Sequence, residues 1–174
     1  MAADTEITVR RAVADDWPAI WTIFSDVVTG GDTYMYAPDI DEAAARAAWL
    51  HLDDIGAGRR VRTTFVALLD EQVVGTALLA PNQPGLGDHV ANAGWMVAPK
   101  LAGRGIGRAF ASAVIDEARR LGYRGMQFNA VVASNTAAIG LWTSLGFEIV
   151  GTIPDAFRHA RRGDTPIHVM YRRL

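Results

Sequence analysis

The sequence contains no cysteine among its 174 residues, and this absence removes several classes of chemistry. A disulfide framework, a zinc ribbon, a cysteine nucleophile and a Cys-x-x-Cys redox site all require that residue. Any covalent acyl-enzyme would therefore have to form on oxygen or nitrogen. Lysine is also scarce, since Lys100 is the one lysine and the other permanent cations are arginines.

Long apolar runs and a strong net charge are absent as well. No apolar run approaches the roughly 18 residues that a membrane span needs. The first six residues, Met-Ala-Ala-Asp-Thr-Glu, have neither the basic start nor the apolar stretch of a signal peptide. The formal net charge of −2 argues against a general nucleic-acid binder, which usually has a basic surface. We therefore expect a cytoplasmic protein that binds neither nucleic acid nor a membrane.

The composition that is present is that of a globular protein, with 50% hydrophobic and 21% charged residues. A chain of this length can bury roughly 70% of its unfolded surface, which is enough for one complete core. We therefore predict one domain over residues 1–174.

The pattern of apolar residues predicts an α/β fold in the order βααβββαβαββ. Alternating or β-branched apolar runs indicate strands at 6–12, 63–69, 73–80, 93–98, 126–132, 147–153 and 167–173. Helical spacing and capping residues indicate helices at about 15–29, 41–50, 105–121 and 136–145.

Residues 96–107, Met-Val-Ala-Pro-Lys-Leu-Ala-Gly-Arg-Gly-Ile-Gly, place a glycine-rich turn between a predicted strand and a predicted helix. Glycines let main-chain N–H groups approach a ligand, and a helix N-terminus adds partial positive charge, so this turn suits a phosphate. The dinucleotide fingerprint G-x-G-x-x-G fails, because Arg108 stands three residues after Gly105 and Phe110 three after Gly107. A Walker loop fails too, since Gly-Lys-Ser/Thr is missing. The alternative is a turn that serves packing alone.

A second motif lies at residues 135–147, which read N-x-x-A-x-x-L-aromatic-x-x-x-G-F. Together with the glycine loop it resembles the GNAT superfamily of acetyl-CoA-dependent N-acetyltransferases, over about residues 90–150. The resemblance implies the single-domain GNAT fold, a mixed sheet of six to seven strands flanked by four helices. The gross arrangement is similar to the bacterial branch that contains phosphinothricin and methionine sulfoximine acetyltransferases, which implies a small, amino-acid-like acceptor.

This resemblance also implies where acetyl-CoA binds, namely where the parallel strands 93–97 and 126–132 splay apart. Main-chain groups of the first strand would pair with the pantetheine arm, and the glycine-loop amides would hold the pyrophosphate. Two arginines would add charge toward the phosphates, and Asn135 would hydrogen-bond the pantetheine arm. The implied cofactor-binding residues are Trp95, Met96, Val97, Gly103, Arg104, Gly105, Ile106, Gly107, Arg108, Asn135, Trp142 and Ser144. We expect no metal.

Two positions depart from the family pattern. The glycine loop usually begins with glutamine or arginine, whereas Ala102 stands here; its backbone N–H is retained, so we expect modestly weaker anchoring. The aromatic residue of the second motif is usually a tyrosine that reprotonates the leaving thiolate, whereas Trp142 has only an indole N–H. We expect Trp142 to be a wall against the cofactor. A thiol pKa of about 8.5 lets the thiolate leave with water or the substrate ammonium as the acid.

On the substrate side, an amine must lose a proton to attack, and a base or an ordered water has to take it. We predict His89, Asn92 and Asn129 as catalytic candidates, with His89 the first choice because an imidazole pKa near 6.5 suits a base. A surface histidine is the alternative. Tyr34, Tyr36 and Asn82 are the predicted substrate-binding residues, and a small hydrophobic core beneath a loop is the alternative for the two tyrosines.

The leading hypothesis is an enzyme that transfers acetyl from acetyl-CoA to a primary amine by direct attack, without an acyl-enzyme. A non-catalytic acetyl-CoA-binding module and a peptide or protein N-acetyltransferase are the alternatives. The apolar last strand, residues 167–171, either pairs across a homodimer or completes the sheet of the monomer.

Overall fold

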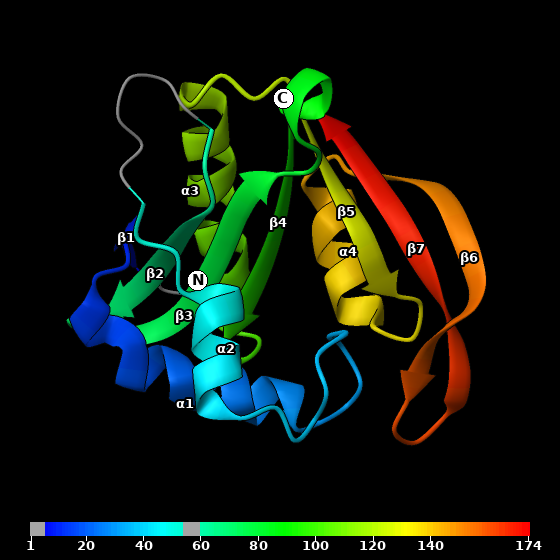
Figure 1. Cartoon of the computed structure of the whole chain (residues 1–174), viewed down its shortest axis with the longest axis horizontal. Helices are drawn as coiled ribbons and strands as arrows, with labels where there is room; N and C mark the ends of the chain where they lie inside the picture. The colour runs from blue at the N-terminus through cyan, green and yellow to red at the C-terminus, as the bar shows by residue number, and fades with distance from the viewer. Residues whose placement is uncertain (1–5, 54–59) are drawn as a thin grey trace.

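The computed structural model describes residues 6–53 and 60–174, and these form seven strands and four α-helices around one sheet (Figure 1). The helices are α1 (Trp17–Val28), α2 (Glu42–Trp49), α3 (Ile106–Arg120) and α4 (Thr136–Ser144). The strands are β1 (Thr8–Arg11), β2 (Thr63–Leu69), β3 (Gln72–Pro81), β4 (Val90–Val97), β5 (Gly125–Val132), β6 (Glu148–His159) and β7 (Gly163–Arg173). The predicted order of elements and the predicted fold class are confirmed.

The strands follow the order β1-β2-β3-β4-β5-β7-β6 across the sheet, and every neighbouring pair is antiparallel except β4 and β5. The last strand, β7, lies between β5 and β6, so both of its edges are paired within the chain. This corresponds to the second of the two alternatives, in which residues 167–171 complete the sheet of the monomer. Among the described residues, the strands at the two edges of the sheet are β1 and β6.

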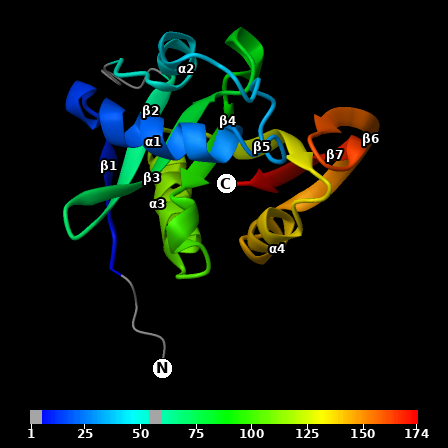
Figure 2. The same ribbon diagram turned by 90° about the horizontal axis from the view of Figure 1, so that it is seen from below.

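Helices cover both faces of the sheet (Figure 2). One core cluster joins α1 and α2 to one face, and the other joins α3 and Trp142 of α4 to the opposite face. Strand β2 shows how the period of two distributes side chains, because Phe65 and Ala67 belong to the α3 cluster whereas Val66 belongs to the α1 cluster. No helix of the described residues is long and apolar enough to cross a membrane.

Local sequence signals explain several element boundaries. The carboxylate of Asp41 accepts a hydrogen bond from the Ala44 N–H at 2.8 Å and caps α2. The tight turn between β2 and β3 places Asp70 and Glu71 at φ of 49° and 63°, the conformation that a two-residue hairpin turn requires. Strand β6 runs beyond the predicted end at residue 153, because a bulge at Asp155, with φ of 52°, lets pairing with β7 resume.

Candidate active site

The site begins where β4 and β5 separate. The two strands pair only at Val90–Gly125 and Ala91–Met126, after which each is hydrogen-bonded on its outer side alone, β4 to β3 and β5 to β7. At this point the side chain of Asn92 takes the place of a main-chain hydrogen bond between β4 and β5, since its Nδ2 donates to the Gln127 carbonyl at 2.9 Å. The divergence predicted between the two parallel strands is therefore present.

The open edge of β4 presents the main-chain groups of every second residue. Hydrogen bonds from Asn82 N–H to the Val90 carbonyl and from Ala98 N–H to the Val74 carbonyl fix which residues face β3. Because bonding alternates along an antiparallel pair, Met96 also bonds toward β3, and the residues on either side of it face the gap. The main chain of Met96, predicted to pair with pantetheine, is therefore turned toward β3 instead.

Of the three residues predicted to pair with pantetheine, Trp95 and Val97 keep their main-chain groups on the open side of β4. The Trp95 carbonyl accepts a hydrogen bond from the Tyr34 hydroxyl at 2.8 Å, which places that carbonyl toward the gap. Tyr34 is one of the predicted substrate-binding residues, so the loop after α1 reaches the strand that is predicted to bind the cofactor.

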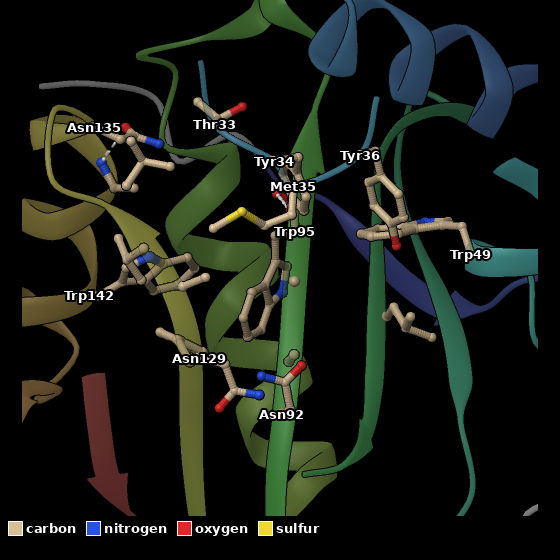
Figure 3. Close-up of a pocket in the computed structure, with 18 residues that line it drawn as sticks. Thr33, Tyr34, Met35, Tyr36, Trp49, Asn92, Trp95, Asn129, Asn135 and Trp142 are labelled. Atoms are coloured by element: carbon tan, nitrogen blue, oxygen red, sulfur yellow. Dashed lines mark hydrogen bonds between the residues drawn. The ribbon is translucent and has the colours of Figure 1, made fainter. Parts of the chain in front are cut away.

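A cavity of about 410 Å³ occupies the gap between β4 and β5 (Figure 3). Its volume is in the range typical of small-molecule sites. Six aromatic rings line its wall, and they come from the loop after α1, from α2, β4, β5 and α4: Tyr34, Tyr36, Trp49, Trp95, Phe128 and Trp142. The remaining polar side chains of the wall are Thr33, Asn92, Asn129 and Asn135.

Charged side chains are missing from this wall among the described residues. Burial raises the pKa of Tyr34 far above its ordinary value, with a smaller contribution from Tyr36, so this phenol is a proton-bearing donor at neutral pH. Burial likewise raises the pKa of Tyr36, while the charge of the exposed Arg62 lowers it. The cavity therefore has neutral polar groups to offer a ligand.

Of the predicted catalytic residues, the structure brings Asn92 and Asn129 to the cavity and leaves His89 outside its wall. His89 lies in the loop before β4, where its carbonyl accepts the Arg124 N–H at 2.8 Å. Asn129 donates from Nδ2 to Asn82 Oδ1 at 2.7 Å, so Asn82 supports the wall from behind. The described wall thus contains no imidazole and no carboxylate.

The glycine loop lies at the N-terminus of α3, and its geometry suits an anion. Gly103 and Gly105 have φ of 78° and 81°, and a Cβ at either position would meet no atom within 4 Å. The N–H groups of residues 103–107 have no main-chain acceptor among the described residues, whereas the Arg108 N–H donates to the Gly105 carbonyl at 3.1 Å. The Arg108 N–H is therefore not free for an anion, and Arg108 is left with its side chain for this purpose.

The other predicted cofactor residues hold α4 in place. Asn135 caps the helix, because its Oδ1 accepts the Ala138 N–H at 3.1 Å, and it also lines the cavity. Ser144 accepts a hydrogen bond from the Arg108 guanidinium at 2.6 Å, which connects α4 to α3. The exposed guanidinium of Arg104 lies on the same loop.

Trp142 is only 9% exposed and packs in a group of aromatic rings. Its ring centroid lies 4.9 Å from that of Trp95, 4.8 Å from that of Phe128 and 6.0 Å from that of Phe147. Trp142 thus forms part of the cavity wall, and its role toward the cofactor stays a prediction.

Sequence reasoning missed the support of the loop after α1. The Ala160 N–H, in the turn between β6 and β7, donates to the Gly31 carbonyl at 2.9 Å, and Arg161 pairs with Asp32 at 3.1 Å. These residues are about 130 positions apart in the chain, so no local pattern predicts the contact. The hairpin therefore braces the loop that carries Tyr34.

Comparison with solved structures places this fold among acetyltransferases. A GCN5-related N-acetyltransferase from Kribbella flavida is 46% identical, with a TM-score of 0.87 over 97% of this chain and 98% of that one. A GNAT superfamily phosphinothricin acetyltransferase from Sinorhizobium meliloti, solved in complex with AcCoA, is 26% identical, with a TM-score of 0.81 over 97% of this chain and 88% of that one.

Two relatives found by sequence similarity are also acetyltransferases, although the matched segments cover different shares of the two proteins. N-acetyltransferase aca1 of Schizosaccharomyces pombe is 40% identical over 86 residues, which are 49% of this chain and 41% of that protein. The L-methionine sulfoximine/L-methionine sulfone acetyltransferase of Pseudomonas aeruginosa is 30% identical over 155 residues, 84% of this chain and 83% of that protein. The chain thus spans less than half the length of the first relative and most of the second.

The splayed strands, the glycine loop at the start of α3 and the helix that begins at Asn135 all fall in one segment of the chain. The model of the acetyltransferase (GNAT) family matches residues 17–147, a range that contains all three features. The chain belongs to this acetyltransferase family.

Proposed function

We propose that the protein transfers an acetyl group from acetyl-CoA to the primary amine of a small, amino-acid-like acceptor by direct attack. The single observation that carries the proposal is the aromatic-lined cavity between β4 and β5, which lies against an open strand edge. The similarity to the methionine sulfoximine and phosphinothricin acetyltransferases supports both the donor and the size of the acceptor.

The cofactor half of the site consists mainly of main-chain groups. We assign pantetheine to the open edge of β4, where the groups of Trp95 and Val97 face the gap, as an added strand would bind. The pyrophosphate is assigned to the free N–H groups of residues 103–107, with charge from the exposed Arg104 and Arg108. The main-chain N–H of Trp95 would polarise the thioester carbonyl, because a fixed donor stabilises developing negative charge.

The acceptor half consists of side chains from the loop after α1. Tyr34 ties this loop to β4 by its hydrogen bond to the Trp95 carbonyl, and Tyr36 stacks on it with ring centroids 6.2 Å apart. The bonded loop limits the room beside β4, which favours a small acceptor over an extended peptide.

Proton transfer in this site is assigned to water. Asn92 uses its Nδ2 on the Gln127 carbonyl, which leaves Oδ1 to accept an N–H of the attacking amine. A neutral amide cannot take the proton itself, and the described wall has no imidazole or carboxylate, so the base is solvent. Trp142 gives no proton either, and the thiolate leaves with water as the acid.

A test of this proposal is release of CoA thiol, measured with a thiol-reactive dye over amino acids, methionine sulfone, phosphinothricin, polyamines and short peptides. The chain has no cysteine, so all thiol signal comes from CoA. We expect turnover with a small amino acid and little with peptides. Turnover with peptides alone would refute the small acceptor, and absence of acetyl-CoA binding would refute the whole proposal.

The pH dependence of the same reaction tests the route of the proton. With solvent as base, kcat/KM rises with pH until the pKa of the substrate amine, and His89→Gln leaves this profile unchanged. An inflection near pH 6.5 that disappears in His89→Gln would assign the base to His89 and overturn the water route.

A non-catalytic acetyl-CoA-binding module is the second candidate. It is favoured by one observation, the absence of a titratable base from the described wall. Saturable binding of acetyl-CoA without turnover over the whole panel would support it.

The homodimer stays a prediction. Strand β7 is paired on both edges, so a second copy would have to use another surface, such as β6, on which Ile149, Val150 and Ile153 are exposed. Light scattering of the purified protein gives the mass that decides it.

A further inference from the structure

Several donor groups of the cavity wall already have an acceptor within the protein. The Tyr34 hydroxyl donates to the Trp95 carbonyl, and the Trp49 indole N–H donates to Thr76 Oγ1, both at 2.8 Å. The amide of Asn92 donates to the Gln127 carbonyl at 2.9 Å. These groups hold the wall together and are not free to bind a ligand.

The indole N–H of Trp95 differs from them. Its nitrogen is buried and has no hydrogen-bond partner among the described residues, a property that it shares in this wall with the Thr33 hydroxyl. In Figure 3 this nitrogen lies on the edge of the ring turned away from Trp142. A buried donor without an acceptor is unfavourable and rare in folded proteins, so the group needs a partner that the chain does not supply.

Two neighbouring rings contact Trp95 from one side. Its ring meets Phe128 edge-on at 5.6 Å between centroids and Trp142 at 4.9 Å, and these two rings are themselves 4.8 Å apart. The N–H lies on the edge turned away from Trp142, where no acceptor of the described residues meets it.

We propose that the Trp95 indole N–H binds an oxygen atom of a reactant in the cavity, and this inference rests on the proposed function. An indole N–H donates and never accepts, so its partner must carry a lone pair. The described wall has no charged side chain, so neutral donors such as this indole N–H have to meet an oxygen there. Two reactants offer such an oxygen: acetyl-CoA has the thioester carbonyl, and an acceptor such as methionine sulfone has an oxygen on its side chain.

Paired ligands that differ only in that oxygen test the proposal by NMR of the wild-type protein. S-ethyl-CoA lacks the carbonyl oxygen of acetyl-CoA, and methionine lacks the oxygens of methionine sulfone. The protein has five tryptophans, and the Trp95 indole signal is identified by its absence from Trp95→Phe or by elimination with variants of the other four. We expect this signal to move downfield with the oxygen-bearing member of one pair only, and the pair that responds identifies the source.

Binding constants of variants provide a second readout. Trp95→Phe removes the N–H, whereas Trp21→Phe makes the same substitution outside the cavity wall, beside Trp17 and Phe24, and is the matched control. For Trp95→Phe we expect the preference for the oxygen-bearing ligand over its partner to fall about tenfold, as for the loss of one hydrogen bond. Trp21→Phe retains the preference.

The outcomes separate this inference from the proposed function. If acetyl-CoA moves no signal of the protein, the proposed function fails and the inference fails with it. If ligands bind but the Trp95 signal responds equally to both members of each pair, or Trp95→Phe keeps the preference, the inference alone is overturned. Should Trp95→Phe not fold, the wild-type NMR comparison still decides.

Discussion

The hydrogen bond from Tyr34 to Trp95 gives the sharpest test of how the loop after α1 closes the site. Tyr34→Phe removes one hydroxyl and keeps the ring, which stays packed on Tyr36 and Trp49 with centroids at 6.2 and 5.9 Å. No cavity larger than an oxygen atom is created. The change in the free energy of unfolding therefore reports the hydrogen bond alone.

The magnitude follows from what the substitution leaves behind. A neutral hydrogen bond contributes about 0.5–1.5 kcal/mol, and a buried carbonyl left without a donor costs about 1–3 kcal/mol. The Trp95 carbonyl faces a cavity that water can enter, so we expect a loss of about 1–2 kcal/mol. For a chain of this length each kcal/mol lowers the Tm by about 2–4 °C, which gives a decrease of about 2–8 °C.

Thermal unfolding followed by circular dichroism measures this decrease. Tyr36→Phe is the matched control, because the Tyr36 hydroxyl donates to no acceptor among the described residues, and we expect a change within about 0.5 kcal/mol. Equal Tm values for Tyr34→Phe and the wild type would refute the hydrogen bond. Added acetyl-CoA should stabilise Tyr34→Phe at least as much as the wild type, since the freed carbonyl becomes available to pantetheine.

Three further predictions address other parts of the fold and the site. Gly105→Ala should weaken acetyl-CoA binding and cost about 1–2 kcal/mol of stability from φ of 81° alone, whereas Gly140→Ala in α4 should be neutral or stabilising, as calorimetry will show. Asn92→Ala should lower the free energy of unfolding by about 1 kcal/mol, because the Gln127 carbonyl loses its donor, and CoA release should fall in the same variant. Burial raises the pKa of Tyr123 above its unfolded value, so it stays protonated in the folded state while the unfolded chain ionises above about pH 10. Stability therefore falls there, and Tyr123→Phe should reduce that fall by up to about 1.4 kcal/mol per pH unit in denaturant titrations.

The order of elements is predictable because each strand and helix carries its own local signal. Helix α3 shows this well, since Ile106, Phe110 and Val114 recur at helical spacing and are all buried. The far ends of β6 and β7 lack such a signal, because the burial of their residues alternates poorly and Pro154 interrupts the run. Their pairing depends on the partner strand, which periodicity within one strand does not reveal.

The cofactor half of the candidate site could be predicted for the same reason. The glycines of the loop and Asn135 lie in short motifs, and their conformations follow from local geometry. The hydrogen bond from Tyr34 to Trp95 joins residues 61 positions apart in the chain. The lack of an acceptor for the Trp95 indole N–H depends on the tertiary packing around it, which no local pattern reveals. His89 shows the same limit of local reasoning. It directly precedes β4 in the sequence, yet it lies outside the cavity wall.

The difference between the cofactor half and the acceptor half of the site has a physical origin that bears on substrate choice. The open edge of β4 and the amides of residues 103–107 bind through main-chain groups, so many side-chain substitutions leave them intact. The acceptor half depends on side chains of a loop that is held by Tyr34 on one side and by the β6–β7 turn on the other. Substitutions in that loop change the cavity without changing the sheet. Relatives that share the cofactor motifs are therefore expected to differ in their amine acceptors, and the identity of the acceptor has to be sought in residues 31–36 and in Trp95.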